Sequence, residues 1–188
     1  MADRQDIILN ATLELVSEHS LLGPSISQIA KRAKASPGII YHYFDSKDEI
    51  MHSLYLKVFK ELMDTLALSE EEHEKLSCLE RLKEIWLRSF DFHISNPMKT
   101  KFIEQYKSSS YFTKEQEQAT NMLLGPLIIM IQKDITQGDI QDLPLRVVHA
   151  MTMGVADSVA KSQIAGALDL KGESLEKVAD TACKSVLV

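Results

Sequence analysis

The sequence has few residues that break or cross-link a chain: 7 glycines, 5 prolines and 2 cysteines among 188 residues. The alternation of β-branched and polar residues that is typical of strands is also missing, so the composition favours an all-α protein. Cys78 and Cys183 lie far apart and neither belongs to a CxxC pair. This spacing argues against a disulfide scaffold and against a thiolate metal site.

Long apolar runs are missing as well, and no stretch reaches the length that spans a membrane. Residues 1–6 are polar and acidic, unlike the apolar centre of a signal peptide. We therefore expect a soluble, cytoplasmic protein with no membrane partner. Hydrophobic residues make up 45% of the chain, which is enough for a packed core in one or two small domains.

The formal net charge is -6, which at first disfavours a nucleic-acid partner. The charge is unevenly distributed, however. Residues 27–47 carry four cations and one acid, a local charge of +3. The cations are Lys31, Arg32, Lys34 and Lys47, and the acid is Asp45. This pattern indicates a small basic face on an acidic body.

Three helices are predicted at the start of the chain, and capping signals mark the second and the third. The first helix is predicted over residues 3–19, and its apolar stripe is Ile8, Ala11, Leu15, Val16 and Leu22. Ser25 and Gln28 form a capping box that begins the second helix. After a three-residue turn, Ser36 is a suitable N-cap and Pro37 a suitable first residue for the third helix.

Ser46 and Glu49 form a second capping box, which starts a long helix to about residue 68. The acidic stretch 70–74 is expected to be a solvated loop or the start of a helix. Further helices are predicted up to residue 95 and over 98–108, 113–137, 143–168 and 174–186, with a kink at Gly125-Pro126. The whole chain is thus predicted to be all-α with about nine helices.

The third helix carries side chains suited to a DNA major groove. Ile40 and Phe44 face inward, whereas aromatic and polar residues face outward. Gly38 lets the backbone approach a ligand closely, and Lys47 together with the amides at the helix start can hold a phosphate. The predicted DNA-binding residues are Ser27, Ser36, Pro37, Gly38, Ile39, Tyr41, His42, Tyr43 and Lys47.

Residues 4–50 resemble the N-terminal domain of the TetR family of transcriptional regulators. The resemblance rests on the order and spacing of four segments: residues 29–33 (IAKRA), 36–38 (SPG), 41–44 (YHYF) and 46–49 (SKDE). It implies a homodimer with a helix-turn-helix DNA-binding domain at residues 1–48 and a helical effector-binding and dimerisation domain at residues 49–188. The second domain matches the family in length, helix count and helix order.

Two positions depart from the family pattern. Lys34 stands where glycine is usual, and a left-handed backbone there would cost about 1 kcal/mol. Ile39 stands where a small or hydroxylated residue is usual. Its side chain can contact a thymine methyl group but cannot donate a hydrogen bond to a base edge.

In this family the helical body usually encloses a cavity, and flexible thioethers and aromatic rings suit an apolar pocket. An apolar or aromatic small molecule is therefore the expected effector. The candidate lining residues are Trp86, Phe90, Phe102, Tyr106, Met122 and Met151.

The last two predicted helices are expected to form the dimer as a four-helix interface around a two-fold axis. The candidate interface residues are Val147, Gly154, Val155, Val159, Leu175, Val178 and Ala182. A two-fold dimer implies a palindromic operator, with recognition helices about 34–36 Å apart or a multiple of that distance. The predicted function is a homodimeric repressor that an effector releases from DNA.

Other interpretations remain open. Tyr41 and Tyr43 can instead be rim residues of a small core. The chain would then be a helical ligand-binding or partner-binding protein whose N-terminal domain, residues 1–48 (the head), does not bind DNA. An enzyme is disfavoured because the sequence has no nucleophile–base pair, no HExxH and no phosphate loop. No cofactor or metal is predicted. His93 and His149 are interpreted as core or rim residues, and Cys78 as a small apolar side chain.

Overall fold

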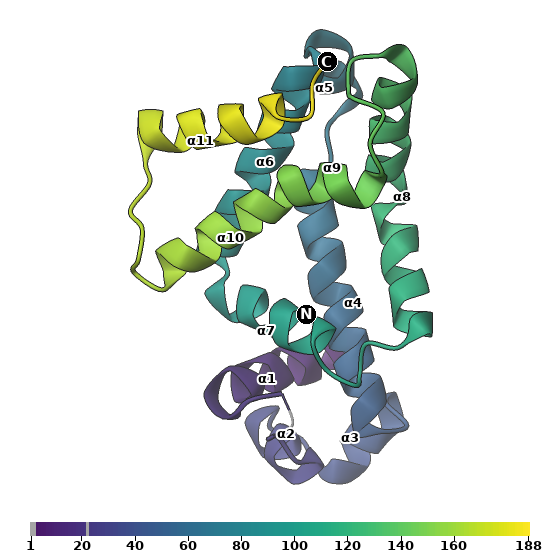
Figure 1. Ribbon diagram of the computed structural model, residues 1–188. Helices are drawn as coiled ribbons and strands as arrows, with labels where there is room; N and C mark the ends of the chain where they lie inside the picture. The colour runs from purple at the N-terminus through teal and green to yellow at the C-terminus, as the bar shows by residue number, and fades with distance from the viewer. Residues whose placement is uncertain (1–2, 22) are drawn as a thin grey trace. The chain divides into compact units, whose positions relative to one another are not determined.

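The computed structural model describes residues 3–21 and 23–188, and this part of the chain is built of helices joined by loops (Figure 1). The predicted all-α fold class is confirmed. Met1 and Ala2 of the predicted head, and Leu22 of the predicted first apolar stripe, lie outside the described residues. The helices are α1 (Arg4–His19), α2 (Ile26–Arg32), α3 (Pro37–Tyr43), α4 (Lys47–Leu66), α5 (Glu70–Lys75), α6 (Cys78–Ser95), α7 (Pro97–Lys107), α8 (Lys114–Gln137), α9 (Leu145–Met151), α10 (Met153–Ile164) and α11 (Gly172–Lys184).

The described residues contain eleven helices, against the nine or so that the sequence predicted. One addition is α5, which forms in the acidic stretch because Ser69 and Glu72 make a capping box. The other arises at Thr152, which divides the predicted 143–168 helix into α9 and α10. The Thr152 hydroxyl donates to the carbonyl of Val148 at 2.7 Å, and its backbone (φ -109, ψ -86) leaves the helical region.

The chain divides into two compact units. The first contains α1–α3, α4 as far as Glu61, and residues 98–122, which include most of α7 and the start of α8. The second contains residues 62–97 and 123–188, with α5, α6, α9, α10, α11 and the rest of α8. Each unit has its own buried side chains, and each is described separately below.

In the first unit, the predicted caps position the helix-turn-helix. Gln28 N–H donates to Ser25 Oγ at 3.3 Å, and Ser25 N–H donates to Gln28 Oε1 at 2.8 Å. Ser36 Oγ likewise accepts from Ile39 N–H at 3.3 Å. The box predicted at the start of α4 is half correct. Ser46 accepts from Glu49 N–H, but the Glu49 carboxylate accepts from the backbone N–H of residue 45.

Ion pairs join these short helices to their neighbours. Arg32 at the end of α2 contacts Glu14 at 3.1 Å and Glu18 at 2.8 Å, both on α1. The Arg32 guanidinium lowers the pKa of the Glu18 carboxyl, chiefly by hydrogen bonding. Lys57 on α4 contacts Asp6 on α1 at 2.7 Å. These pairs tie α2 and α4 to the same helix, α1. Because α3 lies between α2 and α4 in the sequence, the segments on both sides of α3 are held by α1.

In the second unit, α10 and α11 pack against α6 (Figure 1). Trp86 and Phe90 of α6 stack with ring centroids 5.8 Å apart, inside a core to which α10 contributes the fully buried Ala156 and Ala160. Small side chains at these positions let the two helices approach closely. Residues 139–141 pair with the chain after α11 through an antiparallel bridge between Ile140 and Leu187.

A helix crosses a membrane only if it is both long and apolar. Across residues 3–21 and 23–188, no helix combines the two properties sufficiently to cross a bilayer.

Candidate nucleic-acid interface

The turn between α2 and α3 is closed by Lys34 in the left-handed region, with φ 51°. Lys34 N–H donates to Lys31 O at 3.3 Å, and Ala35 N–H donates to Ala30 O at 2.9 Å. The turn therefore keeps the conformation for which the family pattern has glycine, although a lysine occupies the position. A β-carbon in this region is strained, because it approaches the following carbonyl oxygen.

Lys34→Gly is expected to raise the free energy of unfolding by about 0.5–1 kcal/mol, because glycine removes this strain at some cost in chain entropy. Thermal or urea denaturation of the purified protein measures the change. Lys34→Ala is the matched control, since it removes the charge and keeps the β-carbon. Equal stabilisation by both variants would mean that the charge of Lys34, rather than its backbone conformation, is unfavourable.

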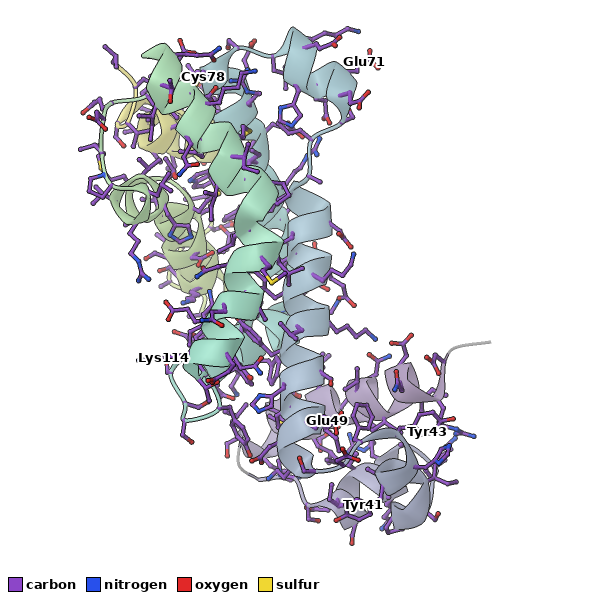
Figure 2. All side chains as sticks on the ribbon, turned by 90° about the vertical axis from the view of Figure 1, so that its right-hand side faces the viewer. Tyr41, Tyr43, Glu49, Glu71, Cys78 and Lys114 are labelled. Carbon is purple, nitrogen blue, oxygen red and sulfur yellow. The ribbon has the colours of Figure 1, made fainter. Side chains whose placement is uncertain are left out.

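Helix α3 has an anchored side and an open side. Ile40 is fully buried and Phe44 is 4% exposed, and these two residues fix α3 to the core of the unit. On the open side, Tyr41 (labelled in Figure 2) is 55% exposed, while Ile39 is 38% exposed. His42 is exposed and contacts the half-buried Tyr43 edge-on, with ring centroids 5.1 Å apart. The open side therefore presents aromatic and polar groups together.

Gly38 is not required by the packing of the head. A β-carbon built at Gly38 would meet Ser36 Oγ at 3.8 Å, an ordinary van der Waals distance, as its nearest described neighbour outside its own helix backbone. Its φ is not positive, since the positive-φ glycines of the described chain are at 138, 166 and 172. The missing side chain thus leaves open space on the surface of α3.

The surface formed by α2, α3 and the start of α4 offers less positive charge than the +3 counted over residues 27–47 of the sequence. Arg32, one of the four cations counted there, contacts two carboxylates of α1 and is engaged in holding α2. Lys31 and Lys34 are exposed, and Lys47 is half-buried at the start of α4. The count of +3 was therefore too high for the charge that α2, α3 and the start of α4 offer to a phosphate backbone.

The other predicted DNA-binding residues lie on the same part of the head. Ser27 is exposed in the first turn of α2, and Pro37 is exposed in the first turn of α3. Ser36 caps α3. Its hydroxyl already accepts a hydrogen bond from Ile39 N–H, so any contact with DNA is made in addition to that bond. The structure thus brings all nine predicted residues onto α2, α3 with its N-cap, and the first residue of α4.

The predicted effector-pocket residues divide between the two units. Phe102 and Tyr106 are buried in the first unit, with ring centroids 5.8 Å apart. Trp86 and Phe90 are buried in the second, where the partly buried Met151 packs against the same core cluster. Met122 is 81% exposed on α8, so it lies outside both groups of buried side chains.

The predicted dimer residues lie on α9, α10 and α11 and differ in exposure. Val147 is 39% exposed, whereas Val155, Val159, Leu175 and Val178 are partly buried against the core of the second unit. Ala182 is 7% exposed and Gly154 is half-buried. Two larger apolar side chains of this region were not among the candidates and are exposed: Ile164 at 42% and Leu168 at 40%.

The histidine and the two cysteines described next make contacts within the second unit. His93 Nε2 lies 2.8 Å from Asp157 Oδ1, which joins α6 to α10. Burial raises the pKa of Cys78, which is also close to Asp134, to about 12. Burial likewise raises the pKa of Cys183 to about 12. Neither thiol is a thiolate at neutral pH, and reactive cysteines are thiolates.

Sequence reasoning missed a cluster on α4. His52, Tyr55 and Phe59 follow one another at helical spacing, and Tyr55 and Phe59 are buried. Tyr55 stacks on Tyr106 of α7 with ring centroids 4.1 Å apart and planes 10° apart. The spacing of the three aromatic residues was visible in the sequence, but their partners on α7 lie about fifty residues further along the chain.

Two short helices, α2 and α3, with α2 held to α1 by ion pairs and one side of α3 exposed, are the arrangement of a helix-turn-helix DNA-binding protein. Comparison with known proteins agrees. The profile described as "Bacterial regulatory proteins, tetR family" matches residues 8–54, and one described as "Tetracyclin repressor-like, C-terminal domain" matches residues 77–187, more than half of the chain. The chain belongs to the TetR family of DNA-binding transcriptional regulators.

Individual relatives cover nearly the whole chain. A Haemophilus influenzae protein described as an uncharacterized HTH-type transcriptional regulator is 26% identical over 184 residues, covering 98% of this chain and 96% of the relative. The crystal structure of a TetR family regulator from Marinobacter aquaeolei gives a TM-score of 0.88 at 19% identity, covering 98% and 95% of the two chains. FadR from Bacillus subtilis in complex with stearoyl-CoA gives 0.73 at 20% identity, covering 97% of each chain. At these identities the two solved structures show a shared fold.

Proposed function

We propose that this regulator is a homodimeric repressor that a small apolar or aromatic effector releases from a palindromic operator. In this proposal residues 1–48 bind DNA, and residues 49–188 bind the effector and form the dimer. The observation that supports it most directly is the open side of α3. Tyr41 is more than half exposed there, and Gly38 leaves space that the packing of the head does not use.

The proposed contacts follow from the exposure of each group. The N-terminal end of α3 enters the major groove, and the backbone at Gly38 approaches the DNA. The hydroxyls of Tyr41 and Tyr43 and the imidazole of His42 contact phosphates or base edges. Lys47 and the first amides of α4 hold a phosphate. Ile39 contacts a thymine methyl group, so it contributes to sequence preference without a hydrogen bond.

The proposed effector site uses the apolar side chains of the helical body. Trp86 and Phe90 supply stacked aromatic faces, and Met151 supplies an adaptable thioether beside them. The stearoyl-CoA complex of Bacillus subtilis FadR, which has the same fold, supports an apolar chain as one class of effector. Acyl-CoA thioesters of graded length therefore belong in the first panel of ligands, together with aromatic compounds.

In the proposed mechanism, effector binding shifts α4, which begins directly after the recognition helix. A shift of α4 in both protomers changes the separation of the two heads, and an operator of fixed spacing is then bound more weakly. Thermodynamic linkage requires that DNA weaken effector binding by the same factor. An effector that binds without changing operator affinity would contradict this mechanism.

Selection from random-sequence DNA with the purified full-length protein tests the proposal. We expect an enriched palindrome, and anisotropy titrations on it should show one dimer per site and affinity that falls as salt rises. Failure to enrich any sequence in the absence or presence of the ligand panel would refute the repressor proposal. It would favour the alternative of a helical ligand-binding or partner-binding protein.

Lys47→Ala is expected to lower operator affinity about threefold to tenfold and to reduce the slope of log affinity against log salt by about two for the dimer. The reason is the loss of one phosphate contact per head. Titrations at four salt concentrations measure the slope. Lys75→Ala is the control, because Lys75 lies on α5 and should leave both values unchanged. An unchanged slope for Lys47→Ala would exclude the phosphate contact.

A further inference from the structure

The first unit contains an aromatic stack that joins α4 to α7, made by Phe59, Tyr55, Tyr106 and Tyr111. Neighbouring ring centroids lie 5.8, 4.1 and 6.2 Å apart, and the planes within each pair differ by at most 24°. Tyr55 and Tyr106 are fully buried. Such flat, parallel contacts favour close approach of the two helices but tolerate sliding of one ring over another, since offset stacking has a broad optimum.

Hydrogen bonds at the stack fix the position that stacking leaves free. His52 Nδ1 on α4 lies 2.6 Å from Tyr106 Oη, and the Tyr106 hydroxyl donates to the carbonyl oxygen of Tyr111 at 3.3 Å. Because that hydroxyl has a single proton, both contacts are made when His52 carries its proton on Nδ1 and donates to Tyr106. Burial raises the pKa of Tyr106, so the hydroxyl keeps its proton.

The same segment of α4 is also fixed to the DNA-binding helices. Lys57 contacts Asp6 of α1 at 2.7 Å, and Ile50, Met51 and Leu54 are buried. His52 therefore lies on the same segment of α4 as Lys57, which contacts α1. A displacement of α7 that keeps the bond between His52 and Tyr106 must carry this segment with it. A displacement that breaks the bond leaves a buried hydroxyl with one partner fewer, which is unfavourable.

We propose that His52 and Tyr106 form a latch that sets the register of α4 on α7 and thereby the position of the DNA-binding head. The latch rests on the repressor function proposed above and names the residues through which the body controls the head. In this proposal the latched arrangement belongs to the DNA-binding form. His52 and Tyr106 are positioning residues and need not contact DNA.

Variants that break the latch are expected to lose more affinity for the full palindrome than for a single half-site. Tyr106→Phe removes the hydroxyl and keeps the stacked ring, and His52→Phe keeps an aromatic edge without a donor. Each is expected to lower affinity for the full palindrome about fivefold or more, within the usual range of coupling between sites. Affinity for a single half-site should change less than about twofold, because one head binds it whatever the separation of the two heads.

Three further variants separate a latch from simple loss of packing. The double variant should bind the full palindrome no more weakly than the weaker single variant, because both changes remove one bond. His52→Asn, which keeps a donor near the position of Nδ1, should retain most of the affinity. Tyr111→Phe is the matched control: it removes a hydroxyl from the same stack but keeps the carbonyl that Tyr106 contacts, and should bind normally.

Several results would overturn the latch: single variants that bind the full palindrome normally, losses that multiply in the double variant, or an equal loss on the half-site. Hydrogen exchange of the full-length protein provides a test without DNA. Tyr106→Phe should speed exchange in residues 47–61 and 98–107 together, and faster exchange in one segment alone would also overturn the latch. If Tyr106→Phe speeds exchange in both segments but no operator can be selected, the latch stands and the repressor proposal is refuted.

Discussion

Gly38→Ala is expected to weaken operator binding at least tenfold while leaving the fold as stable as before or more stable. The two effects have opposite signs for a physical reason. Inside the protein, the new methyl group meets Ser36 Oγ at an ordinary distance, and alanine is favoured over glycine in a helix by about 0.5–1 kcal/mol. Outside the protein, the methyl group occupies the space through which we propose that the backbone of α3 approaches DNA.

The measurement pairs urea denaturation with anisotropy titration on the selected operator. A tenfold loss corresponds to about 1.4 kcal/mol of binding free energy, which one methyl group that prevents close approach readily supplies. Dimer mass should be unchanged, since Gly38 lies on the open side of α3. A variant that is more stable and binds the operator normally would show that α3 does not approach DNA at this position.

Features encoded by neighbouring residues were predictable from the sequence. Ser25, Ser36 and Pro37 mark the ends of α2 and α3, and the structure begins both helices where those signals lie. Asn96-Pro97 separates α6 from α7 in the same way, because a proline ends the preceding helix. Lys34 keeps the left-handed turn for which the family pattern has glycine, with a φ of 51°. In each case the cause lies within four residues of its effect.

Features that depend on distant pairs were not predictable. Arg32 appeared to be a cation for DNA, but its partners Glu14 and Glu18 lie on another helix. His52 and Tyr106 are 54 residues apart, and a single sequence does not show that they meet. The break at Thr152 was missed for a different reason. A buried threonine in an apolar run reads as a helical residue, and its hydroxyl bond to Val148 depends on the environment of the side chain.

The ion pair between Arg81 and Asp134 is another distant contact, and it leads to the largest predicted change in stability. The two residues lie 53 positions apart and join α6 to α8 within the second unit, with Arg81 Nη2 2.6 Å from Asp134 Oδ1. The side chain of Asp134 is 2% exposed and that of Arg81 14%. Arg81 also donates to Leu76 O at 2.8 Å, and Cys78 Sγ lies 3.6 Å from the other carboxylate oxygen.

Asp134→Ala is expected to lower the free energy of unfolding by about 3–5 kcal/mol, because it leaves a buried guanidinium without its counter-charge. For a chain of this size each kcal/mol corresponds to roughly 2–4 °C, so the midpoint of thermal unfolding should fall by about 6–20 °C. Glu71→Ala is the matched control. Its partner Lys75 is 70% exposed, and loss of a surface pair should cost less than about 1 kcal/mol.

The double variant Arg81→Met/Asp134→Leu decides what the pair contributes. If the loss in Asp134→Ala reflects an unpaired buried charge, replacing both charges with apolar groups of similar volume should recover most of the stability. Thermal denaturation of the single and double variants forms a complete comparison. A double variant as unstable as Asp134→Ala would mean that the directed bonds from Arg81 to Asp134 and to Leu76 O, rather than charge balance, hold α6 and α8 together.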